Sequence, residues 1–492
     1  MKVLFIIEDT YGNHDCIGVG ILSSIAKSKS WNTALVVRSG NSTPQIIERI
    51  KSFAPDVIAY SLAIGEHKNI LNLHREIRKQ ISCRYIFGGP YPTYFPDFIN
   101  EDGVDAICIG EGEIAFENYL DKVEEGKDYS NINNLVVKKG PDIIRNPLNF
   151  LIKDLDSIPF SDRQIFRQEL PDLYKDSILI YTSRGCPYSC TYCCNPQFNK
   201  LYETKGSILR MRSVNNVVKE VNELGFKPPI IMFYDDNFLI KPDSWIEEFL
   251  ETYGKKVGIP FTICTSADKI KDPVIKSLKK IGLRSVVYAL ETGDDEVNKN
   301  LLKRPVKVDL VIEAGKILKK NEIFSTLQSI TLLPVADPFK LDLKTLKINQ
   351  KIRPSLAVST PLTPYPGTEI AKYSIEHGYL NPAKIDEIGK INKITTILSF
   401  RDESSMKKSL IIHYFFDLMT HYPFMASIGR YYFLLPLRFY SFLYNFYEIV
   451  FAYKRHFLFL GVKFNAGNIK RLIRQYITYR LFASKIKSGV SI

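Results

Sequence analysis

Three closely spaced cysteines constrain this chain more than any other feature of its sequence. Cys186, Cys190 and Cys193 follow the apolar run 178–181, which is typical of a short buried strand that breaks into a loop at Gly185. Three thiolates in one loop can close on a single metal cluster. A structural zinc site would need a fourth protein ligand, whereas an iron–sulfur cube held by three cysteines leaves one iron open for a substrate or cofactor. We therefore predict an open-iron cluster; three structural cysteines, or a zinc knuckle, are the alternative.

The spacing C-x3-C-x-aromatic-C, with Tyr192 as the aromatic residue, resembles the signature of the radical S-adenosylmethionine (SAM) enzymes. The resemblance implies a 4Fe–4S cluster held by the three cysteines, with SAM chelated at the open iron and Tyr192 among the SAM-binding residues. In that family, one electron from the cluster splits the sulfonium and releases a 5′-deoxyadenosyl radical. Cys194 is expected to be a neighbouring thiol, because a fourth ligand would block the open iron.

The composition is that of a folded protein in a reducing compartment. The 492 residues are 45% hydrophobic and 24% charged, which is enough for two or three domains. Four of the eight cysteines fall between positions 186 and 194, which is no disulfide framework. Residues 1–9 are too short and too soon acidic for a signal peptide. We expect a cytoplasmic protein.

Strands and helices alternate over residues 1–140. Apolar runs typical of buried strands are 3–7, 34–37, 57–60, 85–87 and 106–109. Amphipathic segments such as 43–53 and 69–80 lie between them. The pattern predicts a doubly wound, Rossmann-like α/β domain, whose ligand binds at the carboxyl ends of the strands.

Loops of mostly small residues follow three of these strands. They contain Ser61, Gly88, Gly89, Gly110 and Glu111. The order strand, Gly-Gly-Pro-x-Pro-Thr, strand, Gly-Glu-Gly-Glu resembles the cobalamin-binding domain that precedes many radical SAM barrels, which implies that these five residues bind cobalamin. His14 lacks the spacing of the cobalt-ligating histidine of cobalamin mutases, so we expect a solvated loop histidine, with cobalt ligation as the alternative. A scaffold that no longer binds cobalamin is the alternative for the whole domain.

Residues 141–176 are predicted to be an extended linker, and residues 177–400 a partial (β/α)6 radical SAM barrel. The strand-like runs of the barrel are 178–181, 230–234, 261–264, 285–290, 326–333 and 356–361. Helix-like segments separate them. Chemistry in such barrels occurs at the carboxyl ends of the strands, where the cysteine loop is expected.

Polar residues end two of these strands and could hold a zwitterionic nucleoside. Asp235, Asp236 and Asn237 offer acceptors for an ammonium group, and they resemble the Asp-Asp-x-Phe that contacts the methionine amino group in the family. Glu291 resembles the glutamate of the Ile-Glu-Ser/Thr-Gly signature near the nucleoside. These four residues are predicted to bind SAM; capping of the following helix is the alternative for the carboxylates. Ser266 stands where many relatives carry an arginine for the SAM carboxylate, which leaves that contact open.

The segment 401–492 carries most of the net charge of +13, with 14 Lys/Arg against 4 Asp/Glu. It is rich in Phe and Tyr, and no apolar run approaches the ~20 residues needed to cross a bilayer. We predict a basic, aromatic helical region that packs as a cap on the barrel. The alternative is a surface that rests on anionic membrane at its inner face or holds a lipid-like substrate. Nucleic acid is not an expected partner.

The resemblance implies a cobalamin-dependent radical SAM enzyme, and we predict that it methylates an unactivated carbon. The 5′-deoxyadenosyl radical would abstract a substrate hydrogen, and the carbon radical would take the methyl group of methylcobalamin. The expected partners are a small-molecule substrate, such as a lipid or natural-product precursor, and an electron donor such as flavodoxin or ferredoxin. The alternatives are a non-methylating oxidative cyclisation or rearrangement and, from another class, a cluster-based redox or cobalamin sensor. No further catalytic residue is predicted.

Overall fold

The structure is a computed structural model that describes residues 1–8, 15–384, 388, 395–428 and seven further positions between 437 and 451. The chain forms two compact units. The first contains residues 1–175 and 197–210, and the second contains residues 176–196 and the described residues from 211 onward. His14 and most of the predicted tail lie outside the described residues.

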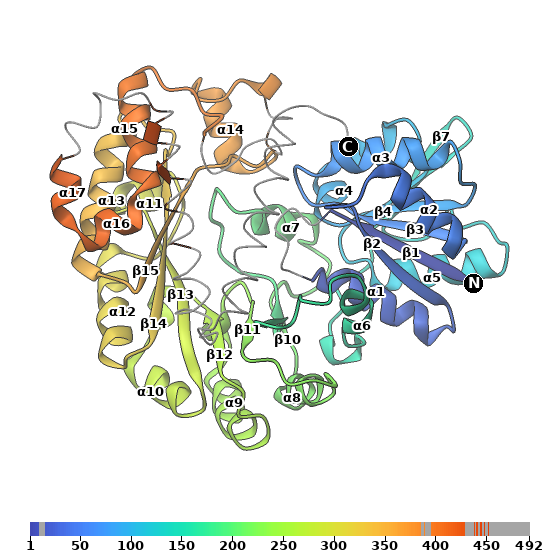
Figure 1. The fold of residues 1–492 in the computed structure, drawn as a ribbon, viewed down its shortest axis with the longest axis horizontal. Coiled ribbons are helices and arrows are strands. Elements are labelled where there is room, and N and C mark those ends of the chain that lie inside the picture. The colour runs from blue at the N-terminus through green and yellow to red at the C-terminus, as the bar shows by residue number, and fades with distance from the viewer. Residues whose placement is uncertain are drawn as a thin grey trace. The chain divides into compact units, whose positions relative to one another are not determined.

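A seven-stranded sheet forms the first unit (Figure 1). Its strands are β1 (Lys2–Ile7), β2 (Asn32–Val37), β3 (Val57–Ser61), β4 (Arg84–Gly88), β5 (Ala106–Cys108), β6 (Leu135–Lys139) and β7 (Asp142–Arg145). Their order is β2-β1-β3-β4-β5-β6-β7, with β1 to β5 parallel and β6 and β7 antiparallel. From β1 the chain adds β2 on one side and then β3, β4 and β5 on the other. The point between β1 and β3, where this order reverses, is the ligand-binding switch point of doubly wound folds. The predicted α/β class is confirmed.

Helices cover both faces of this sheet. They are α1 (Ile17–Ser28), α2 (Thr43–Phe53), α3 (His67–Arg78), α4 (Pro90–Tyr94) and α5 (Glu113–Glu124). Alternate residues of β1 face opposite layers: Leu4 shares a core with Ile46 of α2, whereas the ring of Phe5 contacts Phe116 of α5. A parallel strand buried on both faces is a continuous apolar run, and this explains the pattern of residues 3–7.

The first unit extends beyond the predicted boundary at residue 140. Gly140 lies in the turn of the β6–β7 hairpin, so the boundary cuts a hairpin. The predicted linker is not free chain, because it contributes β7 and α6 (Arg163–Glu169) to this unit. It packs on α1 where Gly20 has no side chain, since a Cβ there would overlap Ser161 Oγ. A buried ion pair between Arg163 and Asp15 fastens it.

Six parallel strands form the sheet of the second unit, in the order β15-β14-β13-β12-β11-β8. They are β8 (Ile178–Ile180), β11 (Ile231–Phe233), β12 (Phe261–Cys264), β13 (Leu283–Glu291), β14 (Phe324–Thr331) and β15 (Leu356–Pro361). Their spatial order follows the order of the chain, as repeated βα units require. This is the predicted partial barrel.

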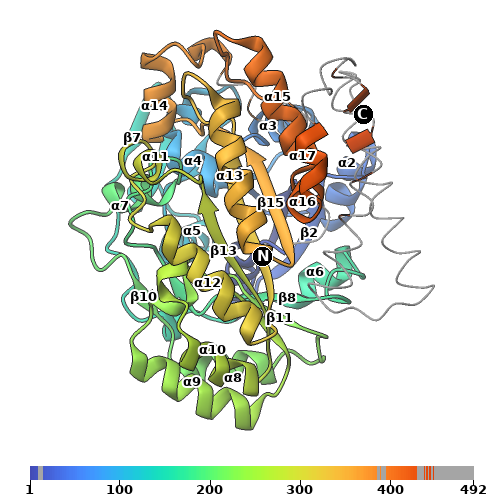
Figure 2. The ribbon, with the colours of Figure 1, turned by 90° about the vertical axis from the view of Figure 1, so that its left-hand side faces the viewer.

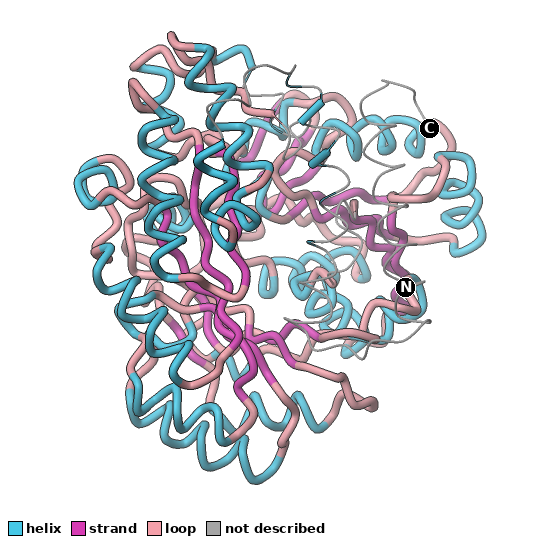
Figure 3. The backbone as a smooth tube through the Cα atoms, turned by 60° about the vertical axis from the view of Figure 1, so that its left-hand side comes forward, coloured by secondary structure: helices cyan, strands magenta, loops and turns pink. Residues whose placement is uncertain are grey.

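Helices line the outer face of this sheet (Figures 1, 2 and 3). They are α8 (Val214–Asn222), α9 (Asp243–Lys256), α10 (Asp272–Lys280), α12 (Val308–Lys320) and α13 (Pro338–Ile352). Phe249 and Tyr253 of α9 pack edge to face on Phe233 and Phe261, which point outward from β11 and β12. Aromatic pairs of this kind stabilise beyond the area that they bury. Shorter elements are β9 (Ser183–Arg184), β10 (Arg210–Met211), α7 (Asn195–Leu201), α11 (Asp295–Asn300) and α14 (Glu369–Glu376).

Three further helices follow in the second unit: two pack beside α13 and β15, and the third packs on the second of these (Figure 2). They are α15 (Glu403–Tyr414), α16 (Phe416–His421) and α17 (Pro423–Ile428). Leu410, Tyr414 and Met419 share a core with Leu341 and Leu346 of α13. The predicted helical region is therefore confirmed as far as it is described. Of the helices in the described ranges, none is both long and apolar enough to cross a bilayer.

Candidate active site

The cysteine loop follows β8 and is clamped through Thr191. The Thr191 N–H donates to Leu302 O at 3.1 Å, and its hydroxyl donates to Leu301 O at 2.7 Å. Its carbonyl accepts from the Ile370 N–H at 3.0 Å. Thr191 is buried and follows Cys190 directly. Because all its polar groups are used, the loop is held in one conformation at this cysteine.

Cys186, Cys190 and Cys193 lie within electrostatic range of one another. Burial raises the pKa of all three thiols, to about 11 for Cys186, and the other two cysteines add to the Cys186 shift. Metal-ligating thiols must be deprotonated, so a cationic centre is needed to hold three thiolates here. Within the described ranges, no three His, Cys, Asp or Glu side chains converge on a point that could hold one metal ion. The donor set fits a cluster, in which each thiolate binds a different iron, better than it fits a single ion.

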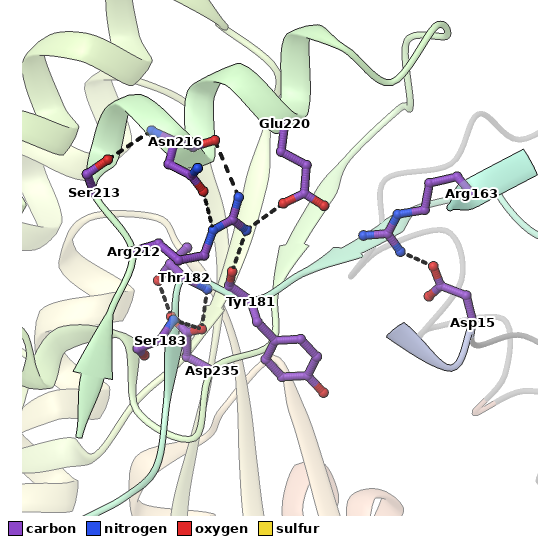
Figure 4. Close-up of polar contacts among 10 residues, drawn as sticks. All are labelled: Asp15, Arg163, Tyr181, Thr182, Ser183, Arg212, Ser213, Asn216, Glu220 and Asp235. Atoms are coloured by element: carbon purple, nitrogen blue, oxygen red, sulfur yellow. Dashed lines mark hydrogen bonds and ion pairs between the residues drawn. The ribbon is translucent and has the colours of Figure 1, made fainter. Parts of the chain in front are cut away.

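Asp235, which follows β11, is used entirely by neighbouring protein groups (Figure 4). Its Oδ1 accepts from the backbone N–H groups of Thr182 at 2.7 Å and Ser183 at 3.1 Å. Its Oδ2 accepts from the Thr182 hydroxyl and lies 2.7 Å from Lys241 Nζ. Both side chains of this ion pair are wholly buried, and burial lowers the pKa of Lys241. Asp235 therefore holds the chain that enters the cysteine loop. Both of its oxygens already have protein partners, so neither is available for the predicted SAM contact.

Asp236 is placed differently. Its side chain is solvent-exposed, and its negative charge contributes to the raised pKa values of Cys186 and Cys193. Desolvation raises the pKa of Asp236 itself, while a hydrogen bond with Asn195 opposes that shift. Asp236 is thus a reachable carboxylate beside the thiols.

Asn237 is buried and offers a donor where the sequence predicted an acceptor. Its Oδ1 accepts from the Thr265 hydroxyl at 2.8 Å and from the Ser266 N–H at 3.3 Å. Its Nδ2 is buried without a partner in the described part of the chain. A buried unpaired donor is costly, so this amide is a candidate to bind an acceptor group of a ligand.

Tyr192, Glu291 and Arg304 form one polar network beside the loop. Tyr192 Oη donates to Glu291 Oε1 at 2.7 Å, and Arg304 Nη1 donates to the same oxygen at 3.3 Å. Glu291 ends β13 with φ 61°, where the strand register shifts after Ala289. The structure thus brings two predicted SAM-binding residues together. Sequence reasoning missed Arg304, because its partners lie 13 and 112 positions away and no local motif marks it.

The inner face of the six-stranded sheet exposes uncharged side chains. Tyr181 and Tyr234 follow β8 and β11, are 36% and 49% exposed, and have ring centroids 6.2 Å apart in an edge-on arrangement. Gln328 of β14 and Thr360, near the end of β15, are exposed. Mixed aromatic and neutral polar groups of this kind suit an organic ligand. The sequence prediction named none of these four residues.

Small residues meet at the carboxyl ends of β3 and β4 in the first unit. Gly89 has φ 94°, and a Cβ there would meet Leu62 O at 2.9 Å and Ser61 Oγ at 3.1 Å. Gly88 O accepts from the Leu62 N–H at 2.9 Å. Cys16 Sγ lies 3.7 Å from Ser61 Oγ, so the chain after β1 returns to the end of β3. Three predicted cobalamin-binding residues therefore gather at the switch point, where a large flat ligand can approach the backbone.

The other two predicted cobalamin-binding residues, Gly110 and Glu111, contact the segment 197–210. A Cβ at Gly110, where φ is 76°, would overlap the Tyr202 phenol. Tyr202 Oη accepts from the Glu111 N–H at 3.0 Å, and the Glu111 carboxylate lies 2.9 Å from Arg210 Nη2. These contacts anchor the returning chain. Tyr202 and Arg210 escaped prediction because the whole segment was assigned to the barrel.

Two models of known families match the chain. The one described as "Radical SAM superfamily" matches residues 180–338, which include the cysteine loop. The chain therefore contains a radical SAM domain. The model described as "B12 binding domain" matches residues 3–120, so the radical SAM domain follows a B12-binding domain in one chain.

The radical SAM chain is similar to several named proteins. It is 25% identical over 403 residues to "Uncharacterized methyltransferase PH0819" of Pyrococcus horikoshii, covering 78% of this chain and 85% of the relative. It is 25% identical over 425 residues to "Anaerobic magnesium-protoporphyrin IX monomethyl ester cyclase" of Rubrivivax gelatinosus, covering 81% and 73%. The solved structure of the cobalamin-dependent SAM radical enzyme OxsB, with aqua-cobalamin and SAM bound, superposes with a TM-score of 0.68 at 15% identity, over 99% of this chain and 80% of that chain. The last match shows a shared fold.

Proposed function

We propose that this radical SAM enzyme uses cobalamin to methylate an unactivated carbon of a small molecule. One observation carries the proposal: a clamped three-cysteine loop at the carboxyl end of β8 and a B12-binding fold occur in the same chain. The methyltransferase named above, which this chain matches over 85% of its length, supports methyl transfer as the outcome.

In this proposal Cys186, Cys190 and Cys193 hold a 4Fe–4S cluster. The bound cofactors supply the 5′-deoxyadenosyl radical and the methyl group, while the protein binds, orients and shields the reactants. Support for this donor set comes from the three neighbouring thiols, of which Cys190 is buried and Cys186 and Cys193 are partly buried, and whose raised pKa values mean that a cationic centre is needed to ionise them. Cys194 is not part of the set.

For SAM, the proposal gives separate roles to residues that the sequence grouped together. The exposed carboxylate of Asp236 suits the ammonium group, and the unpaired Asn237 Nδ2 suits the carboxylate, which the sequence left without a partner. Tyr192 and Glu291 form the opposite side through their shared network. Asp235 acts as the support of the loop.

For cobalamin, we retain Ser61, Gly88 and Gly89, which gather at the switch point. Gly110 and Glu111 would act indirectly, through the segment 197–210 that they anchor. The neutral inner face of the barrel sheet supports an organic substrate, and we propose a natural-product or lipid precursor. A flavodoxin or ferredoxin would supply the electron. We also propose that the basic, aromatic segment 401–492 contacts a membrane surface.

The test is an anaerobic assay of the full chain reconstituted with iron and sulfide. Cob(I)alamin, a strong reductant and SAM labelled on its methyl group are added, and 5′-deoxyadenosine and labelled methylcobalamin are measured. We expect both products from the wild-type protein. Cys190→Ala should lose the cluster and 5′-deoxyadenosine, whereas the matched control Cys194→Ala should keep both.

Two outcomes would redirect the proposal. No 5′-deoxyadenosine from a protein with a full cluster would favour the sensor interpretation. 5′-Deoxyadenosine without labelled methylcobalamin would favour the second candidate, a non-methylating oxidative cyclisation. That candidate is kept because a relative named as a cyclase matches 81% of this chain.

A further inference from the structure

We propose that Arg304 and Glu291 act with opposite signs on the reduction potential of the cluster at the cysteine loop, so that each charge offsets the effect of the other. The inference rests on the proposed function only for the presence of that cluster. It assigns an electrostatic role to the charges of two side chains beside the cluster. No sequence motif identifies one of them, Arg304.

The Arg304–Glu291 pair is held in place by hydrogen bonds of the Arg304 guanidinium. The Arg304 guanidinium donates through Nη2 to Ala289 O at 2.8 Å and through Nη1 to Glu291 Oε1 at 3.3 Å. The side chains of Arg304 and Glu291 are 9% and 10% exposed. A buried charge is screened weakly by salt and water, so its effect on a neighbouring centre is large.

The cysteine loop is attached to the same part of the chain. Thr191 is hydrogen-bonded to the carbonyls of Leu301 and Leu302, which are only three and two positions before Arg304. Tyr192 Oη lies 2.7 Å from Glu291 Oε1 and 3.4 Å from Arg304 Nη1. The pair therefore contacts the residue that lies between two of the three cluster cysteines in the sequence.

A charge pair of this kind makes a prediction with a sign. Adding an electron to the cluster is favoured by a nearby positive charge and opposed by a nearby negative charge. Removing Arg304 alone leaves an uncompensated carboxylate, and removing Glu291 alone leaves an uncompensated guanidinium. Removing both returns the site to neutrality.

The experiment measures the one-electron reduction potential of the reconstituted full chain, without SAM or substrate. Reduction is followed by the electron paramagnetic resonance signal of the reduced cluster in a mediated titration, and iron content is determined in parallel. The variants are Arg304→Gln, Glu291→Gln, the double variant and the charge-conserving Arg304→Lys.

We expect Arg304→Gln to lower the reduction equilibrium constant at least tenfold, a shift of about 59 mV to more negative potential. Glu291→Gln should shift the potential in the opposite direction, and the double variant should return close to the wild type, as should Arg304→Lys. Shifts of the same sign in both single variants, or no shift in either, would overturn the inference. If Arg304→Gln fails to hold a cluster, Glu291→Gln and the double variant still decide it.

Two controls separate charge from structure. Tyr192→Phe removes the hydrogen bond to Glu291 without changing the charge, so the potential should move far less than in the charge variants. Arg212→Gln removes another, partly buried arginine, which is paired with Glu220 of α8 (Figure 4), and should leave the potential unchanged. A wild-type chain that binds no cluster would refute the proposed function, whereas a normal cluster with an unmoved potential would refute only this inference.

Discussion

Replacing Asp235 with asparagine tests whether a single buried carboxylate holds the entrance to the cysteine loop. Asparagine keeps one acceptor oxygen for the two backbone N–H groups, of Thr182 and Ser183, which both donate to Oδ1. Its amide nitrogen replaces Oδ2, the atom that pairs with Lys241 Nζ at 2.7 Å. The substitution therefore removes the charge partner of a wholly buried lysine and the acceptor of the Thr182 hydroxyl.

The magnitude follows from what is left unpaired. Breaking a buried ion pair by removing one partner costs about 3–5 kcal/mol, and release of the Lys241 proton limits the cost, because burial already lowers its pKa. Lys241→Met alone should cost less, since Asp235 keeps its hydrogen bonds to Thr182 and Ser183. The double variant Asp235→Asn/Lys241→Met should recover about 2 kcal/mol or more of the loss in Asp235→Asn.

The assay is anaerobic urea unfolding followed by tryptophan fluorescence. The chain has two tryptophans, and a Trp31→Phe background leaves Trp245 of α9 as the reporter of the second unit. The double-mutant cycle then gives the coupling between positions 235 and 241. A loss below 1 kcal/mol in Asp235→Asn, or a double variant no more stable than that single variant, would refute the reasoning.

Two further predictions concern α13. Gly293→Ala should cost about 1–3 kcal/mol in urea unfolding, because its Cβ would meet the backbone oxygen of Lys344 at 2.8 Å; Gly18→Ala, with nothing within 4 Å of its Cβ, is the control and should cost nothing. Burial raises the pKa of Asp342 from 3.8 to about 8, so its contribution to stability is full below about pH 4 and is lost as the pH rises to about 8. Asp342→Asn should remove this pH dependence. As the pH rises from 4 to 8, the stability of the variant relative to the wild type should increase by several kcal/mol, at about 1.4 kcal/mol per pKa unit. Parallel profiles of stability against pH would contradict the prediction.

The fold was largely predictable because its strands are short apolar runs separated by amphipathic helices. Strands buried on both faces, such as Lys2–Ile7, are visible without an alternating pattern. The hairpin of β6 and β7 was missed because its outer strand is only four residues long and mostly exposed. The packing of residues 141–176 on the first unit could not be predicted for a related reason: Ser161 lies against Gly20, where there is no side chain, and such a close approach leaves no pattern in the local sequence.

The site was predictable where spacing alone carries the chemistry, as it does for the three cysteines. Neighbours in the sequence proved unequal in three dimensions: Asp235 is buried with both oxygens engaged, whereas Asp236 is exposed. Both residues lie in the loop after β11, and a motif cannot show which of two neighbouring loop side chains turns inward. Arg304 and Tyr202 act through partners far away in the sequence, so only the folded chain reveals them.

The path of the chain through the two units has a consequence for how this protein can be divided. Residues 197–210 return to the first unit after the cysteine loop, so no single cut separates a B12-binding fragment from a radical SAM fragment. A fragment that ends at residue 175 would strip Tyr202 from Gly110 and leave the buried Glu111 carboxylate without Arg210. Either unit, when grafted onto another protein, must therefore be transferred together with residues 197–210.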